Sequence, residues 1–182
     1  MNPLKLYRSS AGVRLSPNAE RKVVFVEGAP VVPGMEKTMP EKGQNKYQWK
    51  EGKISIALKP EELMNLAAKC EEIRLGNGEV KELSMVHDPS KGGFQGDKKA
   101  LTLRRTNGST FLTVGEFKDK NNVKKVNVPL SREDLYRLEK FAAQTAMVLD
   151  GWAIGGSPTT NSNRPGDSGD STNGTPGERF PF

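Results

Sequence analysis

The sequence contains few of the residue types on which most catalytic and metal sites depend. Its 182 residues include a single cysteine, Cys70, and a single histidine, His87. One cysteine excludes an internal disulfide framework and fits a reducing compartment. We therefore expect a cytoplasmic protein of a bacterium or of a phage-infected cell. With no second histidine and no cysteine cluster, the sequence offers no metal-ligand set, and we expect neither a metal nor another cofactor.

Long apolar runs are also missing. No stretch approaches the length of a membrane-spanning helix, so we expect no membrane partner. The first residues, Met1 to Tyr7, lack the apolar segment of a secretory signal, and they do not form an Arg- and Ser-rich organelle leader.

The residues with catalytic potential favour a structural interpretation. His87 precedes Asp88 and Pro89, which is typical of a strand end followed by a turn, and no nucleophile accompanies it. Cys70 falls on the apolar side of a predicted helix, which indicates core packing. The segment 91–94 lacks the spacing of a phosphate-binding loop. We therefore expect a protein that is not an enzyme, with a small enzyme centred on His87 as the alternative.

Positive charge is in excess. The chain carries 28 Lys and Arg against 22 Asp and Glu, a net charge of +6, and its pI is near 9.4. The excess belongs to the first 152 residues, because the remaining thirty contain two basic and three acidic residues. A basic body of this kind makes a polyanion the first partner to consider.

The last segment, 153–182, has a composition that does not support folding. Most of its residues are Gly, Pro, Ser, Thr or Asn, so it buries too little apolar surface to offset chain entropy. We predict a nucleic-acid-binding domain over residues 1–152 and a disordered tail over 153–182. The tail ends in Arg179, Phe180, Pro181 and Phe182. Two phenylalanines at such an end indicate a docking motif for another protein, although a frayed terminus is the alternative.

Periodicity in the first half predicts strands and then a helix. Apolar residues alternate with polar ones over 4–7 and 13–15, and a continuous apolar strand is expected at 23–26. The Gly- and Pro-rich stretch 28–43 is typical of a long loop, and we expect the next strand over 47–58. A helix follows from Pro60, with Leu63, Leu66, Ala67 and Cys70 on its apolar side.

The second half repeats this order. Strands are predicted at 83–87, 100–105, 111–117 and 123–128, with Asn107-Gly108 as a hairpin turn and Asn121-Asn122 as a second turn. Ser131 and Asp134 then resemble a capping box that opens an amphipathic helix ending at Gly151. The pattern predicts an α+β protein with roughly eight strands and two helices.

Basic and aromatic side chains are interleaved on the predicted strands. Cations suit phosphates, and flat rings suit the unstacked bases of single strands. The alternative is that the aromatic residues are half-buried core and the cations merely solvate the other face. The candidates for binding single-stranded nucleic acid are Lys5, Tyr7, Arg8, Arg14, Tyr47, Trp49, Lys53, Lys98, Lys99, Arg104 and Phe111.

Several segments, taken in order, resemble the Whirly family of single-stranded-DNA-binding proteins. The stretch 6–17 is similar to the family's opening motif, Lys46-Tyr47-Gln48-Trp49 to its Tyr-Asp-Trp segment, and the stretch 86–92 to its Phe-His-Asp-Pro signature. The resemblance covers about residues 4 to 152. The last residues, Phe180 to Phe182, instead resemble the terminus of bacterial single-stranded-DNA-binding proteins, with fewer acidic residues before them.

The Whirly resemblance implies two four-stranded antiparallel sheets and helices that hold a homotetramer. It also implies that single strands run along sheet edges with little sequence preference. Ser10 stands where the family has the lysine associated with assembly beyond a tetramer, so the resemblance does not extend to such assembly. We expect a protein that protects single-stranded DNA in replication, recombination or repair and recruits partners through its tail. RNA binding and regulation through melted DNA remain alternatives.

Overall fold

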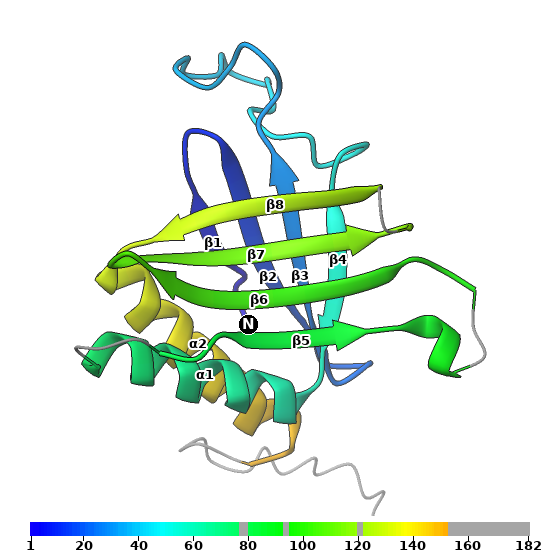
Figure 1. Cartoon of the computed structure of the whole chain (residues 1–182), viewed down its shortest axis with the longest axis vertical. Coiled ribbons are helices and arrows are strands. Elements are labelled where there is room, and N and C mark those ends of the chain that lie inside the picture. Colours follow the sequence, from blue (N-terminus) through cyan, green and yellow to red (C-terminus); the bar gives the residue numbers. More distant parts are fainter. Residues whose placement is uncertain (77–79, 93–94, 120–121, 153–182) are drawn as a thin grey trace, which may run out of the picture.

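Two four-stranded antiparallel sheets form the body of the molecule, and the strands of one sheet run across those of the other (Figure 1). The computed structural model describes residues 1–76, 80–92, 95–119 and 122–152. The C-terminal segment 153–182, expected to be a disordered tail, and Asn121 of the predicted second turn lie outside the described residues. The bounds of the eight strands are β1 Leu4–Tyr7, β2 Ala11–Asn18, β3 Val23–Pro30, β4 Ile54–Leu58, β5 Leu83–His87, β6 Lys98–Thr106, β7 Ser109–Phe117 and β8 Val123–Leu130.

The first sheet has the strand order β1-β2-β3-β4. Its register pairs Leu6 with Val13 and Leu15 with Val26, so the apolar residues of each strand fall on one face. Ile54, Ile56 and Leu58 continue that face on β4. Because side chains alternate along a strand, Tyr7, Arg14 and Glu27 point to the opposite face.

The second sheet has the order β5-β6-β7-β8. Asn107 and Gly108 join β6 to β7 with φ angles of 50° and 77°. Asn and Gly adopt positive φ angles more readily than other residues, which is why this pair suits a tight hairpin. The predicted turn is confirmed. Leu101, Leu103 and Leu112 turn toward the first sheet and are completely buried.

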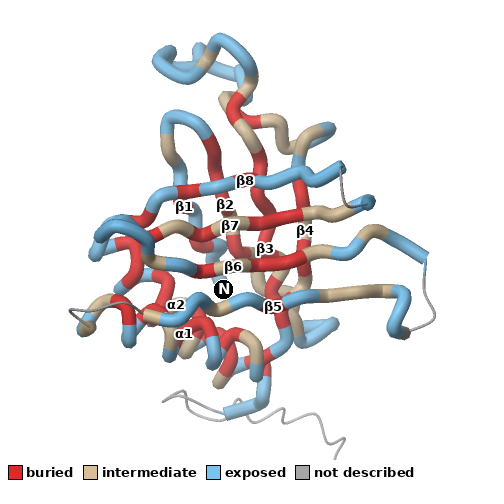
Figure 2. The backbone as a smooth tube through the Cα atoms, viewed as in Figure 1, coloured by how far each residue is buried: buried red, intermediate tan, exposed pale blue. Residues whose placement is uncertain are grey.

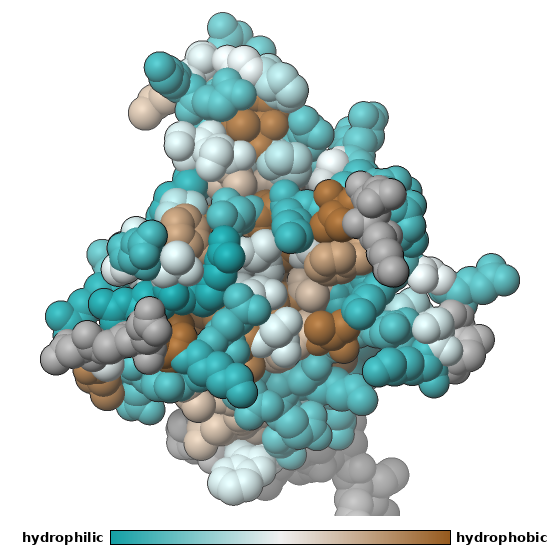
Figure 3. Space-filling view, in the orientation of Figure 1, coloured by the Kyte–Doolittle hydropathy of each residue, from teal (hydrophilic) through white to brown (hydrophobic). Residues whose placement is uncertain are grey.

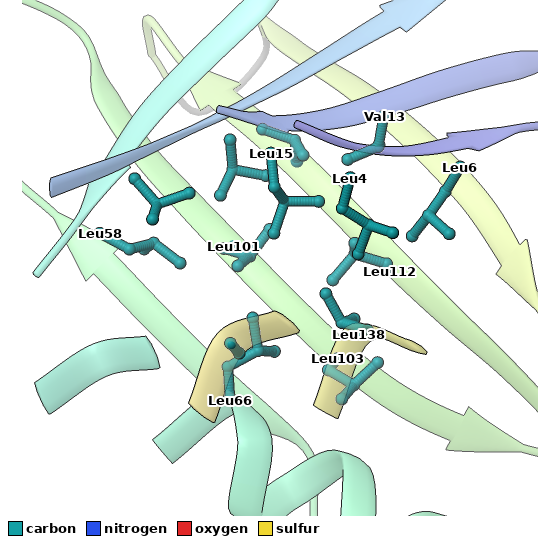
Figure 4. Close-up of a cluster of buried hydrophobic side chains, with 14 of the residues drawn as sticks. Leu4, Leu6, Val13, Leu15, Leu58, Leu66, Leu101, Leu103, Leu112 and Leu138 are labelled. Atoms are coloured by element: carbon teal, nitrogen blue, oxygen red, sulfur yellow. The ribbon is translucent and has the colours of Figure 1, made fainter. Parts of the chain in front are cut away.

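The two apolar faces pack directly on each other and form the core (Figures 2 and 4). Gly28 allows β3 to lie close to β7 and β8 of the other sheet. A Cβ at this position would lie 3.0 Å from Val126 Cβ and 3.2 Å from Val114 Cβ. Consequently the other face of each sheet points away from its partner sheet.

Two helices, α1 Pro60–Leu75 and α2 Arg132–Leu149, lie side by side at one end of the sheets (Figure 1). The predicted capping box of α2 is confirmed: the Asp134 amide donates to Ser131 Oγ at 3.1 Å, and the Ser131 amide donates to Asp134 Oδ2 at 2.8 Å. The apolar stripe predicted for α1 is buried as expected. Within the described residues, no helix has both the length and the apolar composition that crossing a bilayer requires.

The connection between β3 and β4 differs from the prediction. β3 continues through Gly28 to Pro30, because Gly28 pairs with Val13 on one side and with Ile54 on the other. The strand expected over 47–58 begins only at Ile54. Residues 49–52 form turns, and the Gly52 amide donates to the Gln48 carbonyl at 3.1 Å.

Candidate nucleic-acid interface

Three aromatic rings gather on the outer face of the first sheet, and we call Tyr7, Tyr47 and Trp49 the aromatic cluster. Their ring centroids lie 5.0 Å apart for the two tyrosines, 5.9 Å for Tyr47 and Trp49, and 6.1 Å for Tyr7 and Trp49. Such tilted contacts suit the electrostatics of aromatic rings. Tyr7 remains 41% exposed and Trp49 is half-buried, whereas Tyr47 is buried against Ala29 and Val31. The cluster therefore presents mainly the Tyr7 ring and part of Trp49 to solvent.

The local backbone explains how residues far apart in sequence meet here. Gly12 pairs with Tyr7, and a Cβ on Gly12 would lie 2.9 Å from Tyr7 Cδ1. The missing side chain therefore leaves room for the ring. Tyr47 reaches the cluster from the β3–β4 connection through an isolated bridge to Val31, and its hydroxyl donates to the Arg8 carbonyl at 2.8 Å.

Tyr47 and Trp49 were thus expected on a strand, and this prediction was wrong. They belong to a loop that folds back over the outer face of the first sheet. Burial raises the pKa of the Tyr7 and Tyr47 hydroxyls, so both stay protonated at neutral pH.

A charged group adjoins the aromatic cluster. The Arg14 guanidinium lies over the Trp49 ring, 4.7 Å from its centroid. Arg14 Nε and Lys53 Nζ donate to the two carboxylate oxygens of Glu27, the lysine at 2.6 Å. Burial alone would raise the pKa of Glu27, but the hydrogen bonds and charges of Arg14 and Lys53 hold it below its usual range. The carboxylate is therefore ionised at neutral pH.

A surface cavity lies beside Trp49. A cavity of about 400 Å³ is lined by Tyr47, Trp49, Lys50 and four neighbours from the same connection, Val32, Asn45, Gln48 and Glu51. It combines an aromatic wall with a cation, which are the groups that contact a base and a phosphate.

Arg8, a predicted binding residue, makes several contacts within the protein. Its Nε donates to the Pro129 carbonyl at 3.1 Å, one terminal nitrogen donates to the Tyr7 carbonyl at 2.8 Å, and the other forms an ion pair with Asp134. These bonds join the β1–β2 turn to the start of α2. With three partners inside the protein, Arg8 contributes to the fold of this protomer, and its predicted contact with nucleic acid stays a prediction.

The outer face of the second sheet carries a separate groove of about 790 Å³. Figure 3 looks onto this face and shows pale and brown residues over the middle of the sheet, bordered by hydrophilic ones. The groove is lined by Glu82, Ser84, Val86, Lys98, Ala100, Thr102, Arg104, Thr113, Gly115, Phe117, Lys118, Asp119, Lys125 and Asn127. Cations at its border and an aromatic ring within it again give the combination that suits a single strand.

Phe117 is the aromatic residue of this groove, and Gly115 makes room for its ring. A Cβ on Gly115 would lie 3.1 Å from Phe117 Cε2, and Lys125 Nζ lies 5.9 Å from the ring centroid. The sequence candidates included neither Lys125 nor Asn127. A signal was present, because alternate residues of 123–128 must share a face with the partner strand's Gly115 and Thr113.

The structure thus divides the predicted site residues between two outer faces. The first sheet carries Lys5, Tyr7, Arg14, Tyr47, Trp49 and Lys53, whereas Lys98, Arg104 and Phe111 lie on the second. Lys99 points to the other side of β6, where it is 3.7 Å from Glu116. The aromatic cluster and the groove of the second sheet face away from each other within one protomer.

The two residues with catalytic potential, His87 and Cys70, lie apart and have different surroundings. His87 Nε2 lies 2.6 Å from Glu62 Oε1, and the other oxygen of Glu62 accepts the Lys59 amide at the start of α1. Burial raises the pKa of Cys70 to about 12, so the thiol is unreactive at neutral pH. In the part of the chain that the structure describes, no three His, Cys, Asp or Glu residues are grouped as a metal site would require.

Comparison with known proteins identifies the fold. No protein-family model and no curated protein matches the sequence. Among solved structures, WHY1 of Arabidopsis thaliana matches with a TM-score of 0.61 and 18% identity, over 83% of this chain and 86% of its own. WHY3 of the same plant matches with 0.61 and 19%, over 84% and 90%.

Two further structures agree. The plant transcriptional regulator PBF-2 matches with a TM-score of 0.58 and 18% identity, covering 83% of each chain. The trypanosomal MRP1/MRP2 structure matches with 0.54 and 12%, over 84% of this chain and 87% of its own. The expectation of two antiparallel sheets with two helices is confirmed, and the chain has the Whirly fold.

Proposed function

We propose that this chain is a non-catalytic protein that binds single-stranded DNA with little sequence preference. The observation that carries the proposal is the aromatic cluster with Arg14 over Trp49, displayed on an outer sheet face. Rings stack on any base and contribute about 1–3 kcal/mol per base, while the cations contact phosphates. The likeness to Whirly structures supports the same function.

The groove of the second sheet extends the proposed interface. It offers Lys98, Arg104 and Lys125 for phosphates and Phe117 for a base. In duplex DNA the bases are stacked inside the helix, so aromatic rings on a sheet cannot stack on them. We therefore expect a preference for unpaired strands.

RNA is the second candidate ligand, and the groove provides the reason. Ser84, Thr102, Thr113 and Asn127 place hydroxyl and amide groups among its cations, where they can contact a ribose 2′-hydroxyl. Regulation through melted DNA is the other alternative, and the description of PBF-2 as a transcriptional regulator favours it.

We propose a homotetramer assembled through the helices. Apolar side chains that are at least 44% exposed lie on or next to them: Met64, Leu75, Tyr136, Val148 and Trp152. Burial of such residues against other copies would remove apolar surface from water. Sedimentation equilibrium tests this assembly, and a monomer at micromolar concentration would contradict it.

The tail has its own proposed role. Residues 1–152 would form the binding domain, and Arg179 to Phe182, outside the described residues, would recruit proteins of replication, recombination or repair. Four copies in a tetramer would raise the apparent affinity through multivalency. One buried cysteine fits the proposed cytoplasmic location in a bacterium or a phage-infected cell.

A salt-titrated binding series tests the function. Single-stranded DNA, duplex DNA and RNA of equal length and mixed sequence are compared by fluorescence anisotropy. We expect tightest binding to single-stranded DNA and a steep loss of affinity with salt, because binding releases counterions. Equal affinity for duplex would contradict the proposal, and tighter binding to RNA would favour the second candidate. Deleting residues 179–182 should leave strand binding unchanged or slightly stronger.

A further inference from the structure

Glu27 is a buried acid in the middle of a surface proposed to bind a polyanion. It lies at the centre of β3, between Arg14 on β2 and Ser55 on β4, and only 8% of the residue is exposed. An acid near a phosphate site opposes binding by charge repulsion alone. Its presence between the cations that adjoin the aromatic cluster therefore needs a reason.

The contacts of Glu27 supply one. Each carboxylate oxygen accepts a hydrogen bond from a different cation, Oε2 from Arg14 Nε and Oε1 from Lys53 Nζ. Lys53 directly follows residues 49–52, the turns that contain Trp49, whereas Arg14 belongs to β2. The Glu27 carboxylate thus links β2 to the β3–β4 connection that contains Trp49.

The other donors of Arg14 and Lys53 have no hydrogen-bond partner among the described residues. Arg14 uses Nε for Glu27, and its two terminal nitrogens form no hydrogen bond with the described residues. Arg14 Cζ lies 4.7 Å from the centroid of the Trp49 ring. Lys53 similarly uses one of three donors. Both cations are fixed in place while most of their donors stay available to a phosphate.

We propose that Glu27 is a positioning residue that orients Arg14 and Lys53 for strand binding and holds Arg14 against Trp49. The proposal rests on the proposed single-strand binding. It makes a prediction opposite to that of net charge: removing the acid increases the positive charge of the surface yet weakens binding.

The test compares Glu27→Gln with Glu20→Gln, both in a Trp152→Phe background in which Trp49 is the remaining tryptophan. Glu20 lies in the exposed β2–β3 turn, so its variant makes the same charge change away from the cluster. Two quantities are measured: the Trp49 emission of the free protein, and the affinity for a mixed-sequence single-stranded 20-mer. Circular dichroism and thermal unfolding establish that each variant is folded.

We expect Glu27→Gln to shift the Trp49 emission and to weaken binding about tenfold, the scale of a misplaced charge-assisted contact. Glu20→Gln should leave the emission unchanged and bind equally or slightly more tightly. In an Arg14→Met background, Glu27→Gln should have a much smaller effect on affinity, because Glu27 acts through Arg14. If Glu27→Gln does not fold, Glu27→Asp is used with Glu20→Asp as its control. This variant keeps the charge but shortens the reach of the carboxylate to Arg14 and Lys53, so it should shift the Trp49 emission and weaken binding to a smaller extent.

Other results would overturn the inference. Unchanged Trp49 emission in a folded Glu27 variant would show that Glu27 does not hold the Arg14–Trp49 pair. Equal or tighter binding by that variant would show that the acid merely repels phosphate. If the parent protein binds no single strand, the proposed function fails, whereas the emission of the free protein still decides whether Glu27 holds the pair.

Discussion

Arg8 and Arg14 lie close together in the first hairpin, yet their side chains have different partners. Arg8 contacts two backbone carbonyls and Asp134, so each of its three side-chain nitrogens has a partner within the protein. Arg14 contacts one carboxylate and one ring and keeps two donor groups for a ligand. At the residue scale, these different partners separate structural arginines from candidate binding residues.

Replacing Arg8 with alanine should reduce stability more than strand affinity. The change removes the link between the β1–β2 turn and α2, and we expect it to lower the free energy of unfolding by about 1–2 kcal/mol, allowing for solvent screening. Urea denaturation measures the effect, with Arg21→Ala in the exposed β2–β3 turn as the control. A large loss of affinity with unchanged stability would show that Arg8 contacts the nucleic acid.

Asp134 should make stability depend on acid pH. Burial opposes its charge, but hydrogen bonds from Ser131 and the charge of Arg8 lower the pKa of its carboxyl. A carboxyl with a lowered folded-state pKa stabilises the fold above its unfolded pKa, and this stabilisation disappears as pH falls through the folded value. Asp134→Asn should thus cost about 0.5–2 kcal/mol at pH 7 and little at pH 2. Thermal unfolding across that range would contradict the account if the loss were independent of pH.

Trp49→Ala should weaken binding to single-stranded DNA about tenfold, because one stacked base contributes about 1–3 kcal/mol. Some stability will also be lost, since Tyr7 and Tyr47 lose a packing partner. Trp49→Phe separates the two effects by keeping a ring in the cluster. Anisotropy titration of both folded variants checks the prediction, and unaltered affinity in each would make Trp49 a purely structural residue.

At the element scale, the two faces of the first sheet should respond differently to the same substitution. Gly28→Ala pushes a methyl group against β7 and β8 and should cost about 1–3 kcal/mol of stability, as overpacking usually does. Gly12→Ala would place a methyl group 2.9 Å from Cδ1 of Tyr7, whose ring is 41% exposed and can move outward, and 3.3 Å from Cε1 of the buried Tyr47. It should cost less stability and more affinity. The two variants serve as controls for each other in unfolding and binding measurements, and the reverse ranking would contradict the assignment of faces.

The sequence predicts the elements well where local signals decide them. Alternation places Ile54, Ile56 and Leu58 on one face, and the Ser131–Asp134 pair opens α2 as expected. Asn107-Gly108 likewise forms a tight turn because its positive φ angles suit these two residues. Each of these features depends on residues close together in the chain.

Features that depend on distant residues were harder to predict. Gly28 joins β3 because its neighbours on β2 and β4 pair with it, and Tyr47 leaves the strand pattern because Arg8 and Val31 hold it in a loop. The division of basic residues between two sheet faces follows from how the sheets stack. Strand periodicity defines two faces without telling which one meets solvent.

At the scale of the whole molecule, the two candidate surfaces lie on opposite sides of the sandwich. A strand that contacts both must pass around one protomer or cross from one protomer to the next. The proposed tetramer would place the aromatic clusters and grooves of several protomers within reach of one strand. Each of these surfaces has its own cations and aromatic rings.

Ultraviolet cross-linking tests the central claim most directly. The complete chain is irradiated with a single-stranded oligonucleotide that contains 5-bromouracil, and the linked peptides are identified by mass spectrometry. We predict links at Trp49 and its neighbours Tyr7 and Tyr47, with further links at Phe117, and few links to the matching duplex. Links confined to other parts of the chain, or equal linkage to duplex, would contradict the account.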